Sequence, residues 1–208
     1  MNKRLFLLPG FGEDTFCFNN LIPYINKHKY KIIHVDYRPV LKKFTFPFIT
    51  VQQFSKQLVN TYAIQSEDKL LGNEICMIGA FNDPQKVIHT FPKMPRATMI
   101  AVLSGLIKTN TLKEYLLNKI KDENYRAVQE EIMDNFDTFS NYELALMLEM
   151  NYQKKIDSIL PNPLRIHDKN DKIIAAPDEE YTAIKGGHFC LNLYPEDTYF
   201  AMQSFLEK

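Results

Sequence analysis

The chain has 208 residues, and its 25 Lys and Arg residues balance its 25 Asp and Glu residues, which gives a formal net charge of +0 at pH 7. A neutral chain without a long basic run lacks the charge that attracts nucleic acid or an anionic membrane, so we expect neither as its main partner. Apolar residues make up 45% of the sequence, which is ordinary for a globular protein, and the length suits a single domain over residues 1–208.

The three cysteines, Cys17, Cys76 and Cys190, lie far apart and show no metal-ligand spacing. We interpret them as free thiols in a reducing compartment. The first residues, MNKRLFLLPG, contain an apolar run too short for a secretory signal or a membrane span. These features predict a cytoplasmic protein with neither a metal nor a cofactor.

Apolar runs and amphipathic stretches alternate along the first part of the chain. Residues 4–10 and 30–38 are apolar or β-branched runs that end in a turn or in polar residues, which predicts two strands. Between them, NNLIPYINKHK (19–29) has apolar residues at helical intervals. An amphipathic helix is expected over 50–65, with Thr50 as its N-cap.

The second part of the chain continues this alternation around one long helical block. The remaining strands are expected in four apolar runs: EICMIG (74–79), ATMIAVLSG (97–105), PLRIHDKND (163–171) and EYTAIKGGHF (180–189). Helical patterns cover 83–91, 108–159 and 196–208. Alternating strands and helices predict an α/β fold, with a mainly parallel sheet and helices on both faces.

Ligands of such sheets bind beyond the carboxyl ends of the strands, so the residues that follow each strand are the candidate site residues. Four stretches qualify: PGFGED, GAFND, HDKND and GGHF. In their order and spacing, these stretches make the chain similar to the α/β-hydrolase fold superfamily over nearly its whole length.

The resemblance implies roles for five residues. In that family a turn after an early strand forms part of the oxyanion hole, and LLPGFGED matches it at Gly10, Phe11 and Gly12. The catalytic acid follows a later strand, which implies Asp171 in IHDKNDKIIAAP. The catalytic histidine follows the last strand, which implies His188 in IKGGHF. The order of acid and then histidine agrees with the chain order of the family.

The nucleophile position is where the sequence departs from the family. The family's elbow reads G-x-S-x-G, because small residues beside the nucleophile allow a strained turn between strand and helix. The matching stretch is Gly79-Ala80-Phe81-Asn82-Asp83, which puts Phe81 in the nucleophile position and Asp83 in place of the second glycine. A phenyl ring cannot attack a carbonyl, so the conventional serine is missing. We group Asn82 with the oxyanion and pocket residues.

Two acidic residues, Glu74 and Asp83, are alternative candidates for the nucleophile. The stretch Gly72–Cys76 would place Glu74 in the slot, but an apolar strand follows this stretch rather than precedes it, which favours a loop. Asp83 would need small neighbours, and it has Phe81 and Gln85 at the flanking positions. With a proline after it, Asp83 also fits an ordinary helix start.

Other polar side chains near the predicted site have ordinary structural explanations. Ser104 would end a strand without the strained turn of an elbow. Cys17 and Cys190 could act only with a lowered thiol pKa, and free cysteines usually pack as small apolar residues. His167 and Asp168 belong to a strand end and its turn, so we interpret both as structural.

Two further segments complete the resemblance. FTFPFIT places Phe44, Phe46 and Phe48 where the family's chain passes near the pocket, so these rings either line the pocket or pack in the core. The helical block at about 106–160 stands where the family inserts a lid.

Two functions from different classes remain open. In the first, the chain is a degenerate α/β-hydrolase, a pseudoenzyme that binds a small apolar or acyl-type molecule. In the second, it is a carboxylic-ester or thioester hydrolase, or a non-covalent acid–base enzyme, that uses His188 and Asp171 with an unconventional nucleophile. Phe81 favours the first function, and the acid–histidine pair keeps the second open. No segment indicates a particular protein partner.

Overall fold

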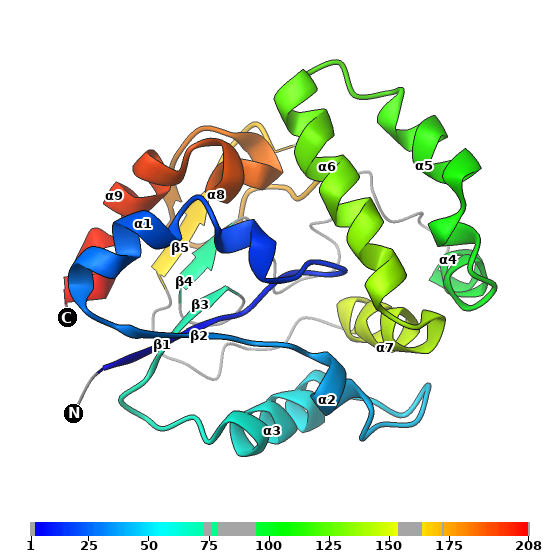
Figure 1. Ribbon diagram of the computed structural model, residues 1–208, viewed down its shortest axis with the longest axis horizontal. Coiled ribbons are helices and arrows are strands. Elements are labelled where there is room, and N and C mark those ends of the chain that lie inside the picture. Colours follow the sequence, from blue (N-terminus) through cyan, green and yellow to red (C-terminus); the bar gives the residue numbers. More distant parts are fainter. Residues whose placement is uncertain (1–2, 73–75, 79–94, 154–163, 172, 208) are drawn as a thin grey trace.

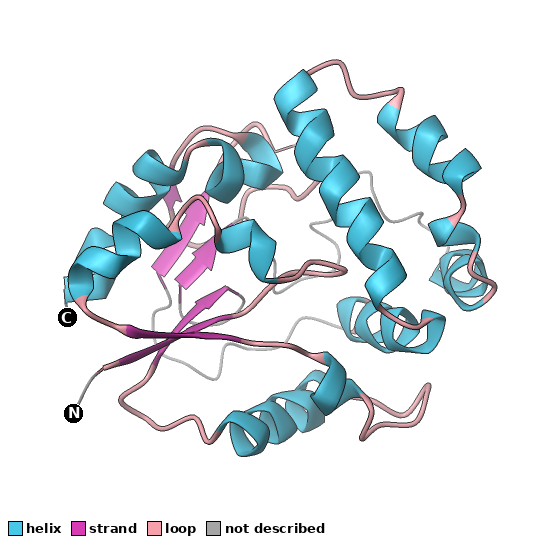
Figure 2. Ribbon diagram, viewed as in Figure 1, coloured by secondary structure: helices cyan, strands magenta, loops and turns pink. Residues whose placement is uncertain are grey.

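The computed structural model describes residues 3–72, 76–78, 95–153, 164–171 and 173–207, and its centre is a parallel β-sheet (Figure 2). Among these residues the strand order is β2-β1-β3-β4-β5-β6, and every pair of neighbours is parallel. The strands are Arg4–Leu7 (β1), Lys31–His34 (β2), Lys69–Gly72 (β3), Cys76–Ile78 (β4), Leu164–His167 (β5) and Thr182–Ala183 (β6). The predicted parallel sheet is confirmed, and its carboxyl ends meet at one edge.

Helices cover both faces of this sheet, as the sequence predicts (Figure 1). One face carries α1 (Ile22–Ile25) and α9 (Pro195–Glu207), with α8 (Cys190–Leu193) beside α9. The other face carries α2 (Arg38–Leu41) and α3 (Val51–Tyr62).

β1 supplies side chains to the cores on both faces. Its residues Leu5, Phe6 and Leu7 are all 0% exposed. Leu5 and Leu7 pack in the same cluster as Met202 of α9, whereas Phe6 packs with Phe54 of α3. Successive side chains of a strand point to opposite faces, so a continuous apolar run is required where helices cover both sides.

Four helices lie to one side of the sheet, beyond its carboxyl edge (Figure 1). They are α4 (Pro95–Leu103), α5 (Asn110–Leu117), α6 (Glu123–Asn135) and α7 (Asn141–Asn151). The last three agree with the helical pattern of 108–159. Within the described part of the chain, no helix has the length and apolar character needed to cross a membrane.

Short 3₁₀ turns join several of these elements. They are Thr15–Phe18 (η1), Asn26–His28 (η2), Leu106–Lys108 (η4), Phe136–Thr138 (η5) and Gly187–Phe189 (η6). The last of them carries the histidine that follows β6.

The predicted strand at 97–105 is wrong, because this segment lies in the helix α4 and the turn that follows it. A short apolar run fits a buried strand and a buried helix equally well by periodicity alone. Pro95 begins the helix, where its missing N–H is no loss, and α4 packs against α7. The hydroxyl of Ser104 therefore follows a helix, and it donates a hydrogen bond to the carbonyl oxygen of Ala101.

β3 is a strand that the sequence analysis missed. Its run KLLG is short and follows two acidic residues, but it lies between β1 and β4, and Leu71 is fully buried. Gly72 has a φ of 140°, and a Cβ there would lie 2.3 Å from the carbonyl oxygen of Leu8. Only glycine fits this close approach of two backbones.

α3 begins at the predicted N-cap. The Thr50 hydroxyl accepts a hydrogen bond from the Gln53 amide (3.1 Å), and the Gln53 side chain accepts one from the Thr50 amide (3.1 Å). This reciprocal capping box satisfies two amides that the helix itself cannot.

Replacing this cap should weaken the fold measurably. Thr50→Ala removes the side-chain acceptor, so we expect the free energy of unfolding in urea to fall by about 1 kcal/mol. Thr61→Ala is the control, since Thr61 is an exposed residue of the same helix whose hydroxyl donates to the carbonyl of Gln57. Its effect should stay within about 0.5 kcal/mol. Equal losses in the two variants would contradict a capping role for Thr50.

Candidate functional site

The turn after β5 and the loop after β6 bring Asp171 and His188 together. His188 Nδ1 lies 3.1 Å from Asp171 Oδ2, and the exposed fractions of the two side chains are 21% and 0%. With Nδ1 engaged by the carboxylate, Nε2 is left to meet a ligand or a substrate proton. The contact implied by the sequence is present, while the catalytic role of the two residues stays a prediction.

Backbone amides hold the Asp171 carboxylate from its other side. Its Oδ1 accepts hydrogen bonds from the amides of Ile173 (2.7 Å) and Ile174 (3.1 Å). A buried carboxylate is stable only when such donors replace water. Asp171 is therefore fixed before any ligand arrives.

Asp168 is a second buried carboxylate in the same turn. Its two oxygens accept hydrogen bonds from the amides of Asn170 (2.8 Å) and Gly187 (2.7 Å). Burial alone would raise the pKa of Asp168, but the amides of Asn170, Gly187 and Gly186, with His167, outweigh burial and lower this pKa. The carboxylate is therefore charged at neutral pH.

His167, the last residue of β5, lies near Asp171 and His188 and supports the turn after the strand. Its Nε2 is 3.2 Å from the carbonyl oxygen of Ile174. Burial lowers the pKa of His167, although the charge of Asp171 opposes this. A neutral imidazole with its proton on Nε2 donates to that carbonyl, which agrees with a structural role.

α6 lies over the site and touches two of its loops. At one end, the ring centroid of Tyr125 lies 4.5 Å from that of Phe189, the residue after His188. At the other end, Asn135 Nδ2 donates to the carbonyl oxygen of Gly12 (2.8 Å). Burial raises the pKa of Tyr125, and the charge of Asp171 adds to this, so its hydroxyl stays a protonated donor near the pair.

The loop after β1 lies beneath the other end of α6, but one of its amides is already in use. The amide of Gly10 donates to Glu13 Oε2 (2.8 Å), and the ring of Phe11 meets Phe136 edge-on at 5.7 Å. An oxyanion hole needs free donors aimed at the developing negative charge. A carboxylate already occupies the Gly10 amide and would repel such a charge.

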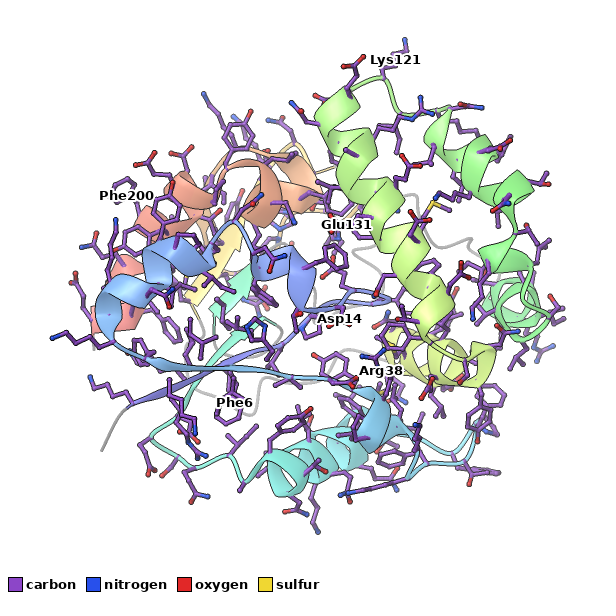
Figure 3. All side chains as sticks on the ribbon, viewed as in Figure 1. Phe6, Asp14, Arg38, Lys121, Glu131 and Phe200 are labelled. Carbon is purple, nitrogen blue, oxygen red and sulfur yellow. The ribbon has the colours of Figure 1, made fainter. Side chains whose placement is uncertain are left out.

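Arg38, at the start of α2, lies at the same carboxyl edge of the sheet, next to the loops after β1 and β2. Its guanidinium donates to Asp36 Oδ1 (2.8 Å) and stands over the ring of Phe139. It also lies 3.4 Å from Asp14 Oδ2 (Figure 3). The side chain thus joins the loops after β1 and β2. It was missed by the sequence analysis, since DYRPV carries no site pattern.

The alternative nucleophiles have little support in the described residues. Cys17 and Cys190 are buried, and burial raises the pKa of both thiols, that of Cys190 to about 12. Their reactive thiolate forms are therefore disfavoured. Ser104 is exposed at the end of α4. In the part of the chain that the structure describes, no group of three or more His, Cys, Asp or Glu side chains could hold a metal ion.

The expectation that no strand precedes Glu74 is wrong, because β3 ends at Gly72, although the order of elements around Glu74 still does not fit an elbow. The next described element, β4, begins at Cys76, so a strand and not a helix follows. An elbow needs a strand, a turn and then a helix. Phe81, Asn82 and Asp83 lie outside the described residues, and α4 replaces the strand that was expected after them.

The phenylalanines of FTFPFIT are not gathered at the His188–Asp171 pair. Phe44 packs near Phe54 of α3, and Phe46 meets Tyr142 of α7. Phe48 is 78% exposed. Their loop lies beside α2 and α3, on the opposite side of the sheet from α8 (Figure 1).

Known proteins resemble this chain in structure and not in sequence. No protein-family model matches the chain, and neither does any curated protein. An esterase from Exiguobacterium antarcticum has 12% identity and a TM-score of 0.66, over 100% of this chain and 92% of that chain. A hydrolase from Oleispira antarctica has 14% identity and a TM-score of 0.70, over 100% and 92%.

A third solved structure, a bromoperoxidase from Bacillus anthracis, has 16% identity and a TM-score of 0.62, over 100% of this chain and 93% of that chain. All three have the α/β-hydrolase fold, and so does this chain.

The packing of the end of α6 against the loop after β1 should depend on Gly12. Gly12 has a φ of 68°, and a Cβ there would lie 2.0 Å from the ring of Phe136. We expect Gly12→Ala to lower the free energy of unfolding by about 2 to 4 kcal/mol through strain and overpacking. At Gly10 the nearest atom to such a Cβ belongs to the flexible Glu13 side chain, so Gly10→Ala should cost less in the same urea titration. The reverse order would contradict this packing.

The pH dependence of stability should report the Asp168 carboxylate. Its folded-state pKa is lowered, so its contribution is complete above about pH 4 and is lost as the pH falls through that pKa. Asp168→Asn should therefore cost about 1.5 to 3 kcal/mol at pH 7. The difference from the wild type should shrink toward pH 3 in urea titrations. A difference that stays constant from pH 7 to pH 3 would contradict the charged state.

Proposed function

We propose that this α/β-hydrolase-fold protein binds a small apolar or acyl-type molecule without forming a covalent intermediate. His188 and Asp171 would form the polar end of the site. The observation that carries the proposal is their 3.1 Å contact, which engages His188 Nδ1 and leaves Nε2 to meet a ligand.

Neither elbow-like stretch of the sequence contains a serine. No serine occurs between Ser66 and Ser104, the part of the chain that contains both elbow-like stretches. Phe81 stands in the position that the family gives to the nucleophile. An imidazole that has no hydroxyl to deprotonate still forms hydrogen bonds at Nε2. The neutral ring with its proton on Nδ1 accepts the hydroxyl of a carboxylic acid there, and the doubly protonated ring donates from Nε2 to a carboxylate.

The surroundings of the pair favour an apolar ligand. Phe189 and Tyr125 form an aromatic contact directly beside His188, and Phe11 and Phe136 form another under the same helix. Apolar and aromatic walls with a few placed polar groups are the usual composition of small-molecule sites.

A hydrolytic function is the second candidate, and the same pair favours it. An imidazole oriented by a carboxylate is a general base for water, which contributes on the order of 10² to 10⁴ in rate. The occupied Gly10 amide counts against it, because one expected donor for the oxyanion is already bound to Glu13.

Ligand binding tests the first function. Titration of the protein with dodecanoate in a calorimeter should give saturable 1:1 binding. His188→Gln should weaken this binding about tenfold, because the hydrogen bond that the charged imidazole donates from Nε2 to the dodecanoate carboxylate is lost. His34→Gln, at an exposed histidine of β2, should leave it unchanged.

An activity assay separates the two functions. We expect no covalent labelling by a fluorophosphonate probe and little turnover of p-nitrophenyl butyrate. Turnover that disappears in His188→Gln but not in His34→Gln would support the hydrolytic candidate. Stoichiometric labelling of any serine would overturn the non-covalent proposal.

A further inference from the structure

We propose that Asp168 is a positioning residue for His188, which fixes the backbone before the histidine so that the imidazole meets Asp171. The sequence analysis gave Asp168 only a structural role in its own turn. The structure extends this role across the edge of the sheet, to the loop that follows the neighbouring strand.

The two carboxylates of the β5 turn have different targets in that loop. Asp168 Oδ2 accepts a hydrogen bond from the backbone amide of Gly187 (2.7 Å), whereas Asp171 Oδ2 contacts the side chain of His188 (3.1 Å). The Asp171 amide also donates to the Asp168 carbonyl oxygen (3.0 Å), which closes the turn. The turn therefore holds the two carboxylates at a fixed separation, one for the backbone and one for the imidazole.

The loop that carries the histidine cannot position itself. Gly186 and Gly187 have φ values of 116° and 62°, a conformation that side chains other than glycine rarely adopt. A Cβ on Gly186 would lie 2.7 Å from Cys190 Cα, so glycine is required there. Two successive glycines leave the backbone with many alternatives, and an external hydrogen bond is needed to select one of them.

A charged carboxylate suits this task better than a neutral acceptor. Asp168 is 5% exposed, and its hydrogen bonds replace the water that a buried anion would otherwise need. Hydrogen bonds to an ionised acceptor are shorter and stronger than neutral ones. The lowered pKa of Asp168 agrees with this, since its amide partners favour the charged form.

The consequence for ligand binding rests on the proposed function, but the positioning itself does not. With Nδ1 bound to Asp171, neutral His188 carries its proton on Nδ1 and presents a bare Nε2. Histidine ¹H–¹⁵N correlation spectra of the ligand-free protein distinguish this tautomer from the other. His188→Gln assigns the signals among the five histidines of the chain.

In the wild type we expect the Nδ1–H tautomer alone. Asp168→Ala should give a mixture of tautomers, as Asp171→Asn should, although Asp168 does not touch the imidazole. Asp68→Asn is the matched control. Asp68 is also a buried carboxylate that accepts a backbone amide, from Gln65 (2.6 Å), but it lies at the opposite edge of the sheet with Arg4. This control should lose stability and keep the wild-type tautomer.

A pure Nδ1–H tautomer in Asp168→Ala would overturn the proposal and leave Asp168 a merely structural residue. If that variant does not fold, Asp168→Asn gives the same reading, with a mixture in support and a pure tautomer against. A tautomer change in Asp68→Asn as large as in the Asp168 variant would also overturn it. Failure of the wild type to bind dodecanoate would remove the proposed function and leave this measurement valid.

Discussion

Two carboxylates, Asp168 and Asp171, are each only 5% exposed at the end of β5, and both are surrounded by protein donors. A buried charge without partners costs several kcal/mol, so the chain near them must present amides and an imidazole in fixed places. Gly187 supplies an amide, His188 supplies the ring, and Ile174 supplies a second amide. The shape of the candidate site follows from satisfying these two charges.

The parallel sheet makes this arrangement possible. Because β5 and β6 run in the same direction, the turn after one and the loop after the other leave the sheet at the same edge. The loop after β1 leaves there too, and α6 lies across both, with Tyr125 at the last loop and Asn135 at the first. A helix of 13 residues is about 20 Å long, enough to join the ends of strands that are not neighbours.

The sequence predicted those parts of the fold and site that depend on local pattern or on motif position. Thr50 was found as an N-cap because capping chemistry is local, and Asp171 and His188 were placed by motifs that follow strands. The prediction of a strand at 97–105 was wrong, because an apolar run does not show whether it packs as a helix or pairs in a sheet. β3 was missed because only its pairing with β1 and β4 makes KLLG a strand. The use of the Gly10 amide by Glu13 depends on the shape of one turn, which no residue pattern encodes.

The presence of an acid–histidine pair in this fold is not by itself a sign of catalysis. Asp171 satisfies the amides of Ile173 and Ile174 as well as the imidazole, so its removal would cost stability whether or not a reaction occurs. An elbow serine has no comparable structural duty, since its hydroxyl must stay free for a substrate. A chain of this fold can therefore hold such a pair for the stability of its turn, whether or not a nucleophile stands beside it. The function of the pair then depends on what reaches Nε2, and under the proposed function this is an apolar molecule with one polar end, next to the aromatic contact of Tyr125 and Phe189.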